Sequence, residues 1–154
     1  MSSNPLSRKM LISYGLGSAA PTLAQEFCGA FLLLFYTELA GLDPVWVGTA
    51  LLFRMLLDAL IDPLVGRWSD RTTSGAGRRR PWIISGSLPG LMFLVILFAV
   101  PNGGQWFHIV YLTIASTLMA IFFSFVSIPH MAMAFEMSEE PKERVRIVGY
   151  RNFV

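Results

Sequence analysis

The residues best suited to chemistry are three charged side chains inside one long apolar stretch. Arg54, Asp58 and Asp62 follow one another at intervals of four residues, so in a helix they project from a single stripe. A charge at mid-membrane costs about 2.5 to 3.5 kcal/mol on insertion scales, and such a stripe should therefore face protein or a wet cavity. This stripe is the first candidate functional site.

The two carboxylates suit a small, hard cation. One helical turn apart, Asp58 and Asp62 offer several oxygens to Na⁺, and their mutual repulsion suits a proton carrier equally well. Ser124 and Ser127 can add hydroxyl ligands if their helix packs alongside, although such hydroxyls more often bond their own backbone. The alternative is a structural ion pair between Arg54 and Asp58, which we disfavour because one arginine cannot neutralise two carboxylates in hydrocarbon.

The surrounding sequence predicts an all-α, polytopic membrane protein. Of its 154 residues 54% are hydrophobic and 14% are charged, whereas about a quarter are charged in soluble domains. The apolar residues gather into four segments, each near the roughly 20 residues that cross the hydrocarbon core. The first has no cleavage site and is interpreted as a retained span. The expected spans are residues 11–39, 45–68, 82–100 and 106–133, and the chain stops at the start of a fifth.

The distribution of basic residues predicts the orientation in the membrane. Eleven of the twelve lysines and arginines precede the first span, lie in or directly before the loop 69–81, or lie in the segment 134–151, and the twelfth is Arg54. The two opposite connections contain none. The positive-inside rule then places both termini in the cytoplasm. We expect an integral protein of a bacterial-type inner (plasma) membrane, surrounded by its lipids.

The loop between the second and third spans contains residues suited to packing, ion pairing and anchoring in addition to its basic charge. Gly66 allows close packing at a helix end, Asp70 can pair with arginines across the loop, and Trp82 can anchor at the headgroups. The alternative is that the arginines are only solvated topology determinants. The candidate loop motif consists of Gly66, Asp70, Arg71, Arg78, Arg79 and Arg80.

Other kinds of chemistry find little support in the sequence. Two histidines and one cysteine, Cys28, form no recognisable catalytic triad or metal cluster, and no phosphate loop or nucleic-acid surface is visible. We therefore expect no enzyme, no nucleic-acid partner, no cofactor beyond the coupling ion, and no metal other than Na⁺ at the two aspartates. Glu26 either lines a solute path or satisfies neighbouring helices, and His130 is interpreted as a packing residue.

Several stretches resemble the glycoside-pentoside-hexuronide:cation symporter family, the melibiose-permease-like branch of the major facilitator superfamily. They are SYGLG, FYTELAGLDPVWVGT, LLDALIDPLVGRWSDRT with GRRRPWI, and IPHMAMAFEM with ERVRIVGYRNF. The resemblance implies a transporter of two six-helix bundles that couples an organic solute to Na⁺, Li⁺ or H⁺. This chain is then expected to be an N-terminal fragment, forming part of the first bundle.

The resemblance also implies roles for individual residues. It places the family's cation site on Asp58 and Asp62, with the coordinating hydroxyl on Ser124. The family's sugar-binding acids fall on Thr22 and Ser127, which are not acids, and Arg54 stands one residue further from Asp58 than the family's arginine does. These departures count against a simple glycoside as solute. The substrate-path candidates are Thr22, Glu26, Ser127 and, for the arginine that opens the fifth helix, Arg151 or Asn152.

Three functions follow from these observations. The leading hypothesis is a cation-coupled symporter of a small organic solute such as a sugar, working by alternating access and needing the missing C-terminal helices or an oligomeric partner. The second is a four-helix proton-coupled exporter that acts as a dimer, which predicts an essential acid in the first span. The third is a non-transporting membrane subunit whose acids pair with a partner's basic residue.

Overall fold

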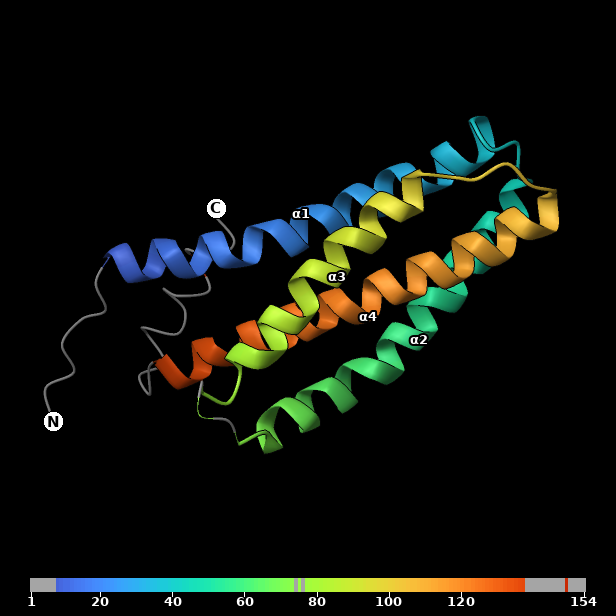
Figure 1. Cartoon of the computed structure of the whole chain (residues 1–154). Coiled ribbons are helices and arrows are strands. Elements are labelled where there is room, and N and C mark those ends of the chain that lie inside the picture. Colours follow the sequence, from blue (N-terminus) through green and yellow to red (C-terminus); the bar gives the residue numbers. More distant parts are fainter. Residues whose placement is uncertain (1–7, 74, 76, 138–148, 150–154) are drawn as a thin grey trace, which may run out of the picture.

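Four long helices account for nearly all of the chain that the structure, a computed structural model, describes: residues 8–73, 75, 77–137 and 149. All four are long and apolar enough to cross a membrane. The prediction of an all-α, polytopic membrane protein is therefore confirmed. The helices are α1 (Arg8–Glu38), α2 (Pro44–Arg71), α3 (Arg80–Phe98) and α4 (Gln105–Met137), shown in Figure 1.

The helices end beyond the apolar segments at the basic side of the protein. α2 continues through the polar residues Ser69 and Asp70 to Arg71, and α3 already begins at Arg80, so the loop expected at 69–81 is shorter. Hydropathy marks where a helix leaves hydrocarbon, whereas its end depends on capping and turn residues. At the opposite side, Asp43 caps α2 because its side chain accepts a hydrogen bond from the Val45 amide at 2.8 Å.

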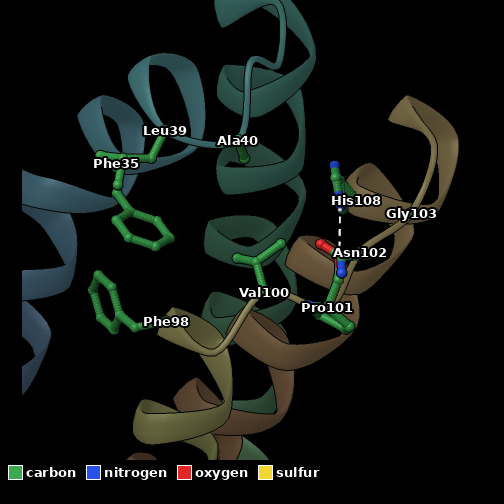
Figure 2. A pocket seen from close by; sticks show the side chains of 9 residues that line it. All are labelled: Phe35, Leu39, Ala40, Phe98, Val100, Pro101, Asn102, Gly103 and His108. Atoms are coloured by element: carbon green, nitrogen blue, oxygen red, sulfur yellow. Dashed lines mark hydrogen bonds between the residues drawn. The ribbon is translucent and has the colours of Figure 1, made fainter.

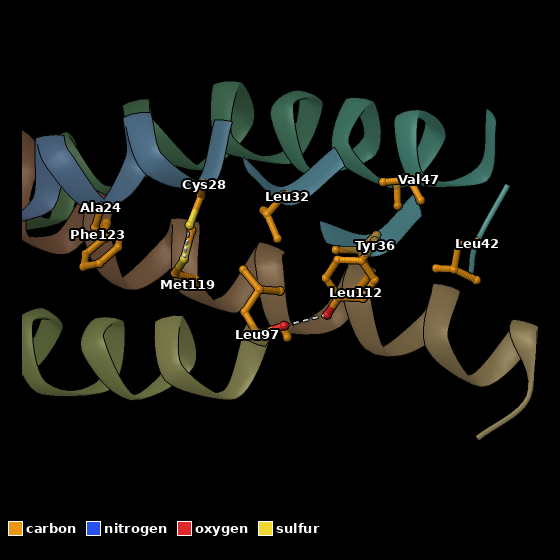
Figure 3. Close-up of a cluster of buried hydrophobic side chains, with 12 residues drawn as sticks. Ala24, Cys28, Leu32, Tyr36, Leu42, Val47, Leu97, Leu112, Met119 and Phe123 are labelled. Atoms are coloured by element: carbon orange, nitrogen blue, oxygen red, sulfur yellow. Dashed lines mark hydrogen bonds between the residues drawn. The ribbon is translucent and has the colours of Figure 1, made fainter. Parts of the chain in front are cut away.

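α4 is the central helix of the described chain. Figure 1 shows it running between α1 and α2, with α3 lying along it, and it contacts all three. α1 presents a buried residue to this core at every fourth position, which places the residues on one face of the helix. The α1 stripe comprises Ala24, Cys28, Leu32 and Tyr36, and it meets Leu112, Met119 and Phe123 of α4 and Leu97 of α3 (Figure 3).

Two glycines bring α3 and α4 into close contact. A Cβ added at Gly86 would lie 2.5 Å from the Phe122 carbonyl oxygen, and one added at Gly90 would lie 2.8 Å from the Phe123 ring. Glycines spaced four apart are a recurrent device for close approach of membrane helices. The close packing predicted for Gly66 is not observed, because a Cβ there would make an ordinary 3.6 Å contact with Ile128.

Candidate functional site

Asp58 and Asp62 of α2 converge on one hydroxyl of α4. The Ser124 Oγ lies 2.6 Å from Oδ1 of Asp62 and 3.2 Å from Oδ1 of Asp58. The four-residue spacing puts both carboxylates on the α2 face that packs against α4, and Ser124 is only 2% exposed at that contact. The structure therefore brings together the three residues that the sequence analysis assigned to the cation site, and their role stays a prediction.

The carboxylates have more acceptor capacity than their surroundings satisfy. A serine hydroxyl carries one proton, so it can donate to Asp58 or Asp62 but not fully to both. No other hydrogen bond or ion pair reaches either carboxylate within the described residues. Two unpaired negative charges inside a membrane are unfavourable. Carboxylate and hydroxyl oxygens are ligands for hard cations, so the arrangement fits a bound Na⁺ or a shared proton.

The alternative of a structural ion pair with Arg54 is not what the structure contains. Arg54 lies one turn from Asp58 on the same helix, yet no ion pair within 4.0 Å joins it to either carboxylate among the described residues. Asp58 instead turns Oδ1 toward Ser124. The carboxylates are thus left available to an external cation.

The substrate-path candidates do not gather around this site. Thr22 and Glu26 are exposed and lie on the side of α1 opposite its buried stripe. The Ser127 hydroxyl donates to the Phe123 carbonyl of its own helix at 2.9 Å, which is the alternative considered from the sequence. Arg151 and Asn152 lie outside the described residues.

The loop motif is organised around a buried arginine. Arg79 is 8% exposed, pairs with Asp70 at 3.2 Å and donates to the Pro129 carbonyl oxygen of α4 at 3.2 Å. Arg78 approaches the same carboxylate at 3.7 Å but is half exposed. These contacts tie the loop and the end of α2 to α4, whereas Gly66 makes only an ordinary contact and Arg71 and Arg80 are exposed.

A second contact at this end joins α1 to α4. The Tyr14 hydroxyl donates to the His130 carbonyl oxygen at 2.9 Å, and the two rings stack with centroids 4.3 Å apart. Gly17 makes this possible, because a Cβ there would lie 2.8 Å from His130 Nε2. Small residues such as Gly17 allow close approach of membrane helices, but which helix approaches here could not be read from the sequence.

A cavity of about 430 Å³ lies at the other end of the helices, away from the carboxylates. Figure 2 shows it between the end of α1 and the turn from α3 to α4. Phe35 and Phe98 form one wall, and His108 lies at the other, where its Nε2 is 3.1 Å from the Pro101 carbonyl oxygen. No acid or arginine lines the cavity, so it adds no charged group to the candidate site.

Comparison with known proteins gives concordant matches along almost the whole chain. The family model described as MFS/sugar transport protein matches residues 13–154. The Escherichia coli inner membrane symporter YicJ is 32% identical over 98% of this chain and 33% of its own length. The putative glycoside/cation symporter YagG of the same organism is 33% identical over 97% of this chain and 32% of its own length. The isoprimeverose transporter of Lactiplantibacillus pentosus is 29% identical over 92% of this chain and 30% of its own length. The chain thus spans about a third of the length of these relatives.

Proposed function

The chain belongs to the MFS/sugar transport protein family, and from that premise we propose that it supplies the N-terminal part of a cation-coupled symporter for a small organic solute. Relatives named as symporters support this proposal, and each is about three times as long as this chain. A facilitator places its binding site between repeated helical halves, so the remaining helices have to come from elsewhere in the polypeptide or from a partner.

The observation that carries the proposal is the hydroxyl shared by two carboxylates. Ser124 supplies one proton to Asp58 and Asp62, which leaves negative charge without a partner in the described chain. A Na⁺ or H⁺ taken up there neutralises the charge and lowers the cost of moving the loaded site through the membrane. Because α2 and α4 both contribute ligands, cation binding also favours one packing of these helices.

The solute is proposed to be a sugar or sugar-like compound. The family description and the names of relatives that carry glycosides or isoprimeverose support this class. Thr22 and Ser127 stand where the resemblance places acids in sugar-specific relatives, so we propose a solute whose recognition needs no carboxylate at these positions. Thr22, Glu26, Ser127, Arg151 and Asn152 stay the candidates for its path.

Both termini are proposed to face the cytoplasm. Arg78, Arg79 and Arg80 follow α2 and none of the described connection 99–104 is basic, which supports a cytoplasmic loop between α2 and α3. Many large apolar side chains are exposed in the described chain. Those that are not covered by further helices of the transporter are proposed to contact membrane lipid.

The rival functions fit the described residues less well. A four-helix exporter needs an acid of α1 in the site, but Glu26 is exposed on the face of α1 that turns away from the buried stripe. A non-transporting subunit needs a basic partner for the two carboxylates. Arg54, the basic residue on the same helix, does not pair with them. A purely structural role for the carboxylates is therefore weakened, and no basic partner for them is present among the described residues.

The test compares the 154-residue chain with the full-length product of its gene in reconstituted vesicles. Uptake of labelled glycosides, including isoprimeverose, is measured under an imposed Na⁺ or H⁺ gradient, with Asp58→Asn as the site variant and Asp43→Asn as the control in the outer connection. We expect gradient-driven uptake by the full-length protein that only Asp58→Asn removes. Uptake that ignores both gradients would contradict the proposal, and flux through the short chain alone would favour the exporter.

A further inference from the structure

Each of the four helices contains a proline in its interior. A proline has no amide hydrogen, so it removes one hydrogen bond of the helix and leaves the carbonyl oxygen four residues earlier without its usual partner. Sharp bends of helices are therefore concentrated at prolines. We refer to each proline and the four residues before it as a proline turn. The four prolines are Pro21 in α1, Pro63 in α2, Pro89 in α3 and Pro129 in α4.

The proline turns of α2 and α3 lie beside the same part of α4. Pro63 directly follows Asp62, which accepts the 2.6 Å hydrogen bond from Ser124 of α4. The glycine after Pro89 packs against the Phe123 ring, because a Cβ added there would lie 2.8 Å from that ring. Phe123 and Ser124 are neighbours in α4, so the two prolines stand at nearly the same level of the bundle.

The proline turn of α1 lies at this level too. Gly17 packs against His130 of α4, and Ala24 lies with Phe123 in the buried cluster of Figure 3. Pro21 stands between these two contacts along α1, so it lies between their levels on α4. The proline of α4 itself directly precedes His130. All four prolines thus fall within about 10 Å along α4, a helix about 50 Å long.

The helix ends on the basic side of the proline turns are tied to one another. Tyr14 and His130 join α1 to α4, and Arg79 holds the end of α2 to α4. α3 is included through Trp82, whose indole N–H donates to the Thr72 hydroxyl at 2.8 Å. We call this part of the described chain the basic end, residues 8–16, 64–73, 77–84 and 130–137. On the other side of the proline turns, the buried cluster packs parts of all four helices into an apolar core.

The common level of the prolines decides how the bundle can bend. Prolines at separate levels would bend each helix at a different place, and the contacts between neighbouring helices would resist this. With the prolines side by side, the basic end can tilt against the apolar core while each keeps its own contacts. Motion between two packed units is absorbed by a few residues at their boundary, and the proline turns form that boundary here.

We infer that the four helices bend together at their proline turns, so that the basic end moves as one unit against the apolar core. The candidate cation ligands lie at this boundary. Asp62 is part of the proline turn of α2, and Asp58 and Ser124 directly precede the proline turns of α2 and α4. Bending alters the distance between ligands on the two helices, so a cation held by both restrains it. This restraint rests on the proposed function, whereas the shared bending does not.

Hydrogen–deuterium exchange of the full-length protein in lipid nanodiscs tests the shared bending. Pro63→Ala restores the missing amide at a position that is exposed in the described chain, so it stiffens α2 without opening a cavity. We expect amide exchange to slow roughly fivefold to tenfold in the proline turns of all four helices, including α4, which carries no substitution. Pro89→Ala repeats the test from α3.

The matched control is Pro81→Ala. Pro81 lies in the first turn of α3, where an amide has no partner within the helix, so the exchange of the proline turns should not change. A second series measures the same amides in the wild type with saturating Na⁺ and, without Na⁺, at lowered pH after correction for intrinsic exchange. Loading of the coupling cation should slow the proline turns of all four helices together.

The outcomes separate this inference from the proposed function. Slower exchange that is confined to the substituted helix in Pro63→Ala and Pro89→Ala would show that the helices bend independently and would overturn the inference. Equal effects of Pro63→Ala and Pro81→Ala would overturn it as well. If the interior substitutions slow all four proline turns but neither Na⁺ nor H⁺ does, the shared bending stands and the proposed cation site is contradicted.

Discussion

The Ser124 hydroxyl of α4 donates a hydrogen bond to Oδ1 of Asp62 on α2 at 2.6 Å. This contact crosses the interface between two helices that are far apart in sequence, and it fixes the rotation of both at the same level of the membrane. Because the same hydroxyl also lies within reach of Asp58, a change at any of the three residues should alter cation binding before it alters the fold.

Removing the shared hydroxyl should weaken cation binding without abolishing insertion. In Ser124→Ala a bound Na⁺ would lose its neutral hydroxyl ligand. Polar contacts to charged groups are typically worth about 1.5 to 3 kcal/mol, so Na⁺ affinity should fall about tenfold or more. Ser124→Thr keeps a hydroxyl and should retain most of the affinity. Ser116→Ala is the matched control, because that hydroxyl bonds its own helix at the Thr113 carbonyl. Equal ²²Na⁺ affinities for both alanine variants would remove Ser124 from the site.

Neutralising the second carboxylate should uncouple transport. Asp62→Asn keeps the size of the side chain and an oxygen that can bond Ser124, but it removes one of the two negative charges that attract the cation. In the full-length protein we expect gradient-driven uptake to disappear while the amount of inserted protein is unchanged. Coupling that survives in properly inserted Asp62→Asn protein would exclude this carboxylate from the mechanism.

The buried arginine of the loop should matter far more for stability than its neighbour. Arg79→Gln breaks the pair with Asp70 and the bond to the Pro129 carbonyl, with an expected cost of about 1 to 3 kcal/mol. Arg78→Gln changes an exposed pair, and exposed pairs contribute about 0 to 1 kcal/mol. Thermal unfolding in detergent measures both. If the two variants unfold at the same temperature, the contact of Arg79 with α4 has no energetic role.

Close packing of α3 on α4 predicts different effects for two glycine substitutions. Gly86→Ala forces a Cβ to within 2.5 Å of a backbone oxygen that cannot move aside, and overpacking of this kind costs about 1 to 3 kcal/mol. Gly66→Ala adds an ordinary contact at 3.6 Å and should be neutral or slightly stabilising. Unfolding midpoints of the two variants provide the comparison. A Gly66→Ala protein that is the less stable of the two would contradict this packing.

Labelling from one side of the membrane tests the proposed orientation. Cys28 is fully buried, and Cys28→Ala gives a background without thiols. In that background Gly75→Cys should react with an impermeant maleimide only after the cytoplasmic side is opened, because the loop is basic. Asn102→Cys, in the opposite connection, should react in intact cells. The reverse pattern would invert the proposed topology.

The sequence alone determined the number of spans, their approximate limits and the common stripe of Asp58 and Asp62. These are local properties, since the length of an apolar segment decides whether it can cross hydrocarbon and the helical period decides which residues share a face. It also indicated that Asp70 pairs with arginine across its loop, because the partners stand only nine residues apart.

Which side chains meet between helices follows from the packing of the four helices and not from local sequence. From helical spacing alone both Ser124 and Ser127 could face the carboxylates, and close packing was expected at Gly66, whereas Gly86 was not singled out. Their different roles follow from the rotation of α4 against α2 and α3, which depends on the sum of many contacts along each helix and has no local pattern. The same rotation leaves Arg54 without an ion pair and turns Glu26 outward. The sequence therefore shows which charged residues the site contains, whereas helix packing determines which side chains contact them.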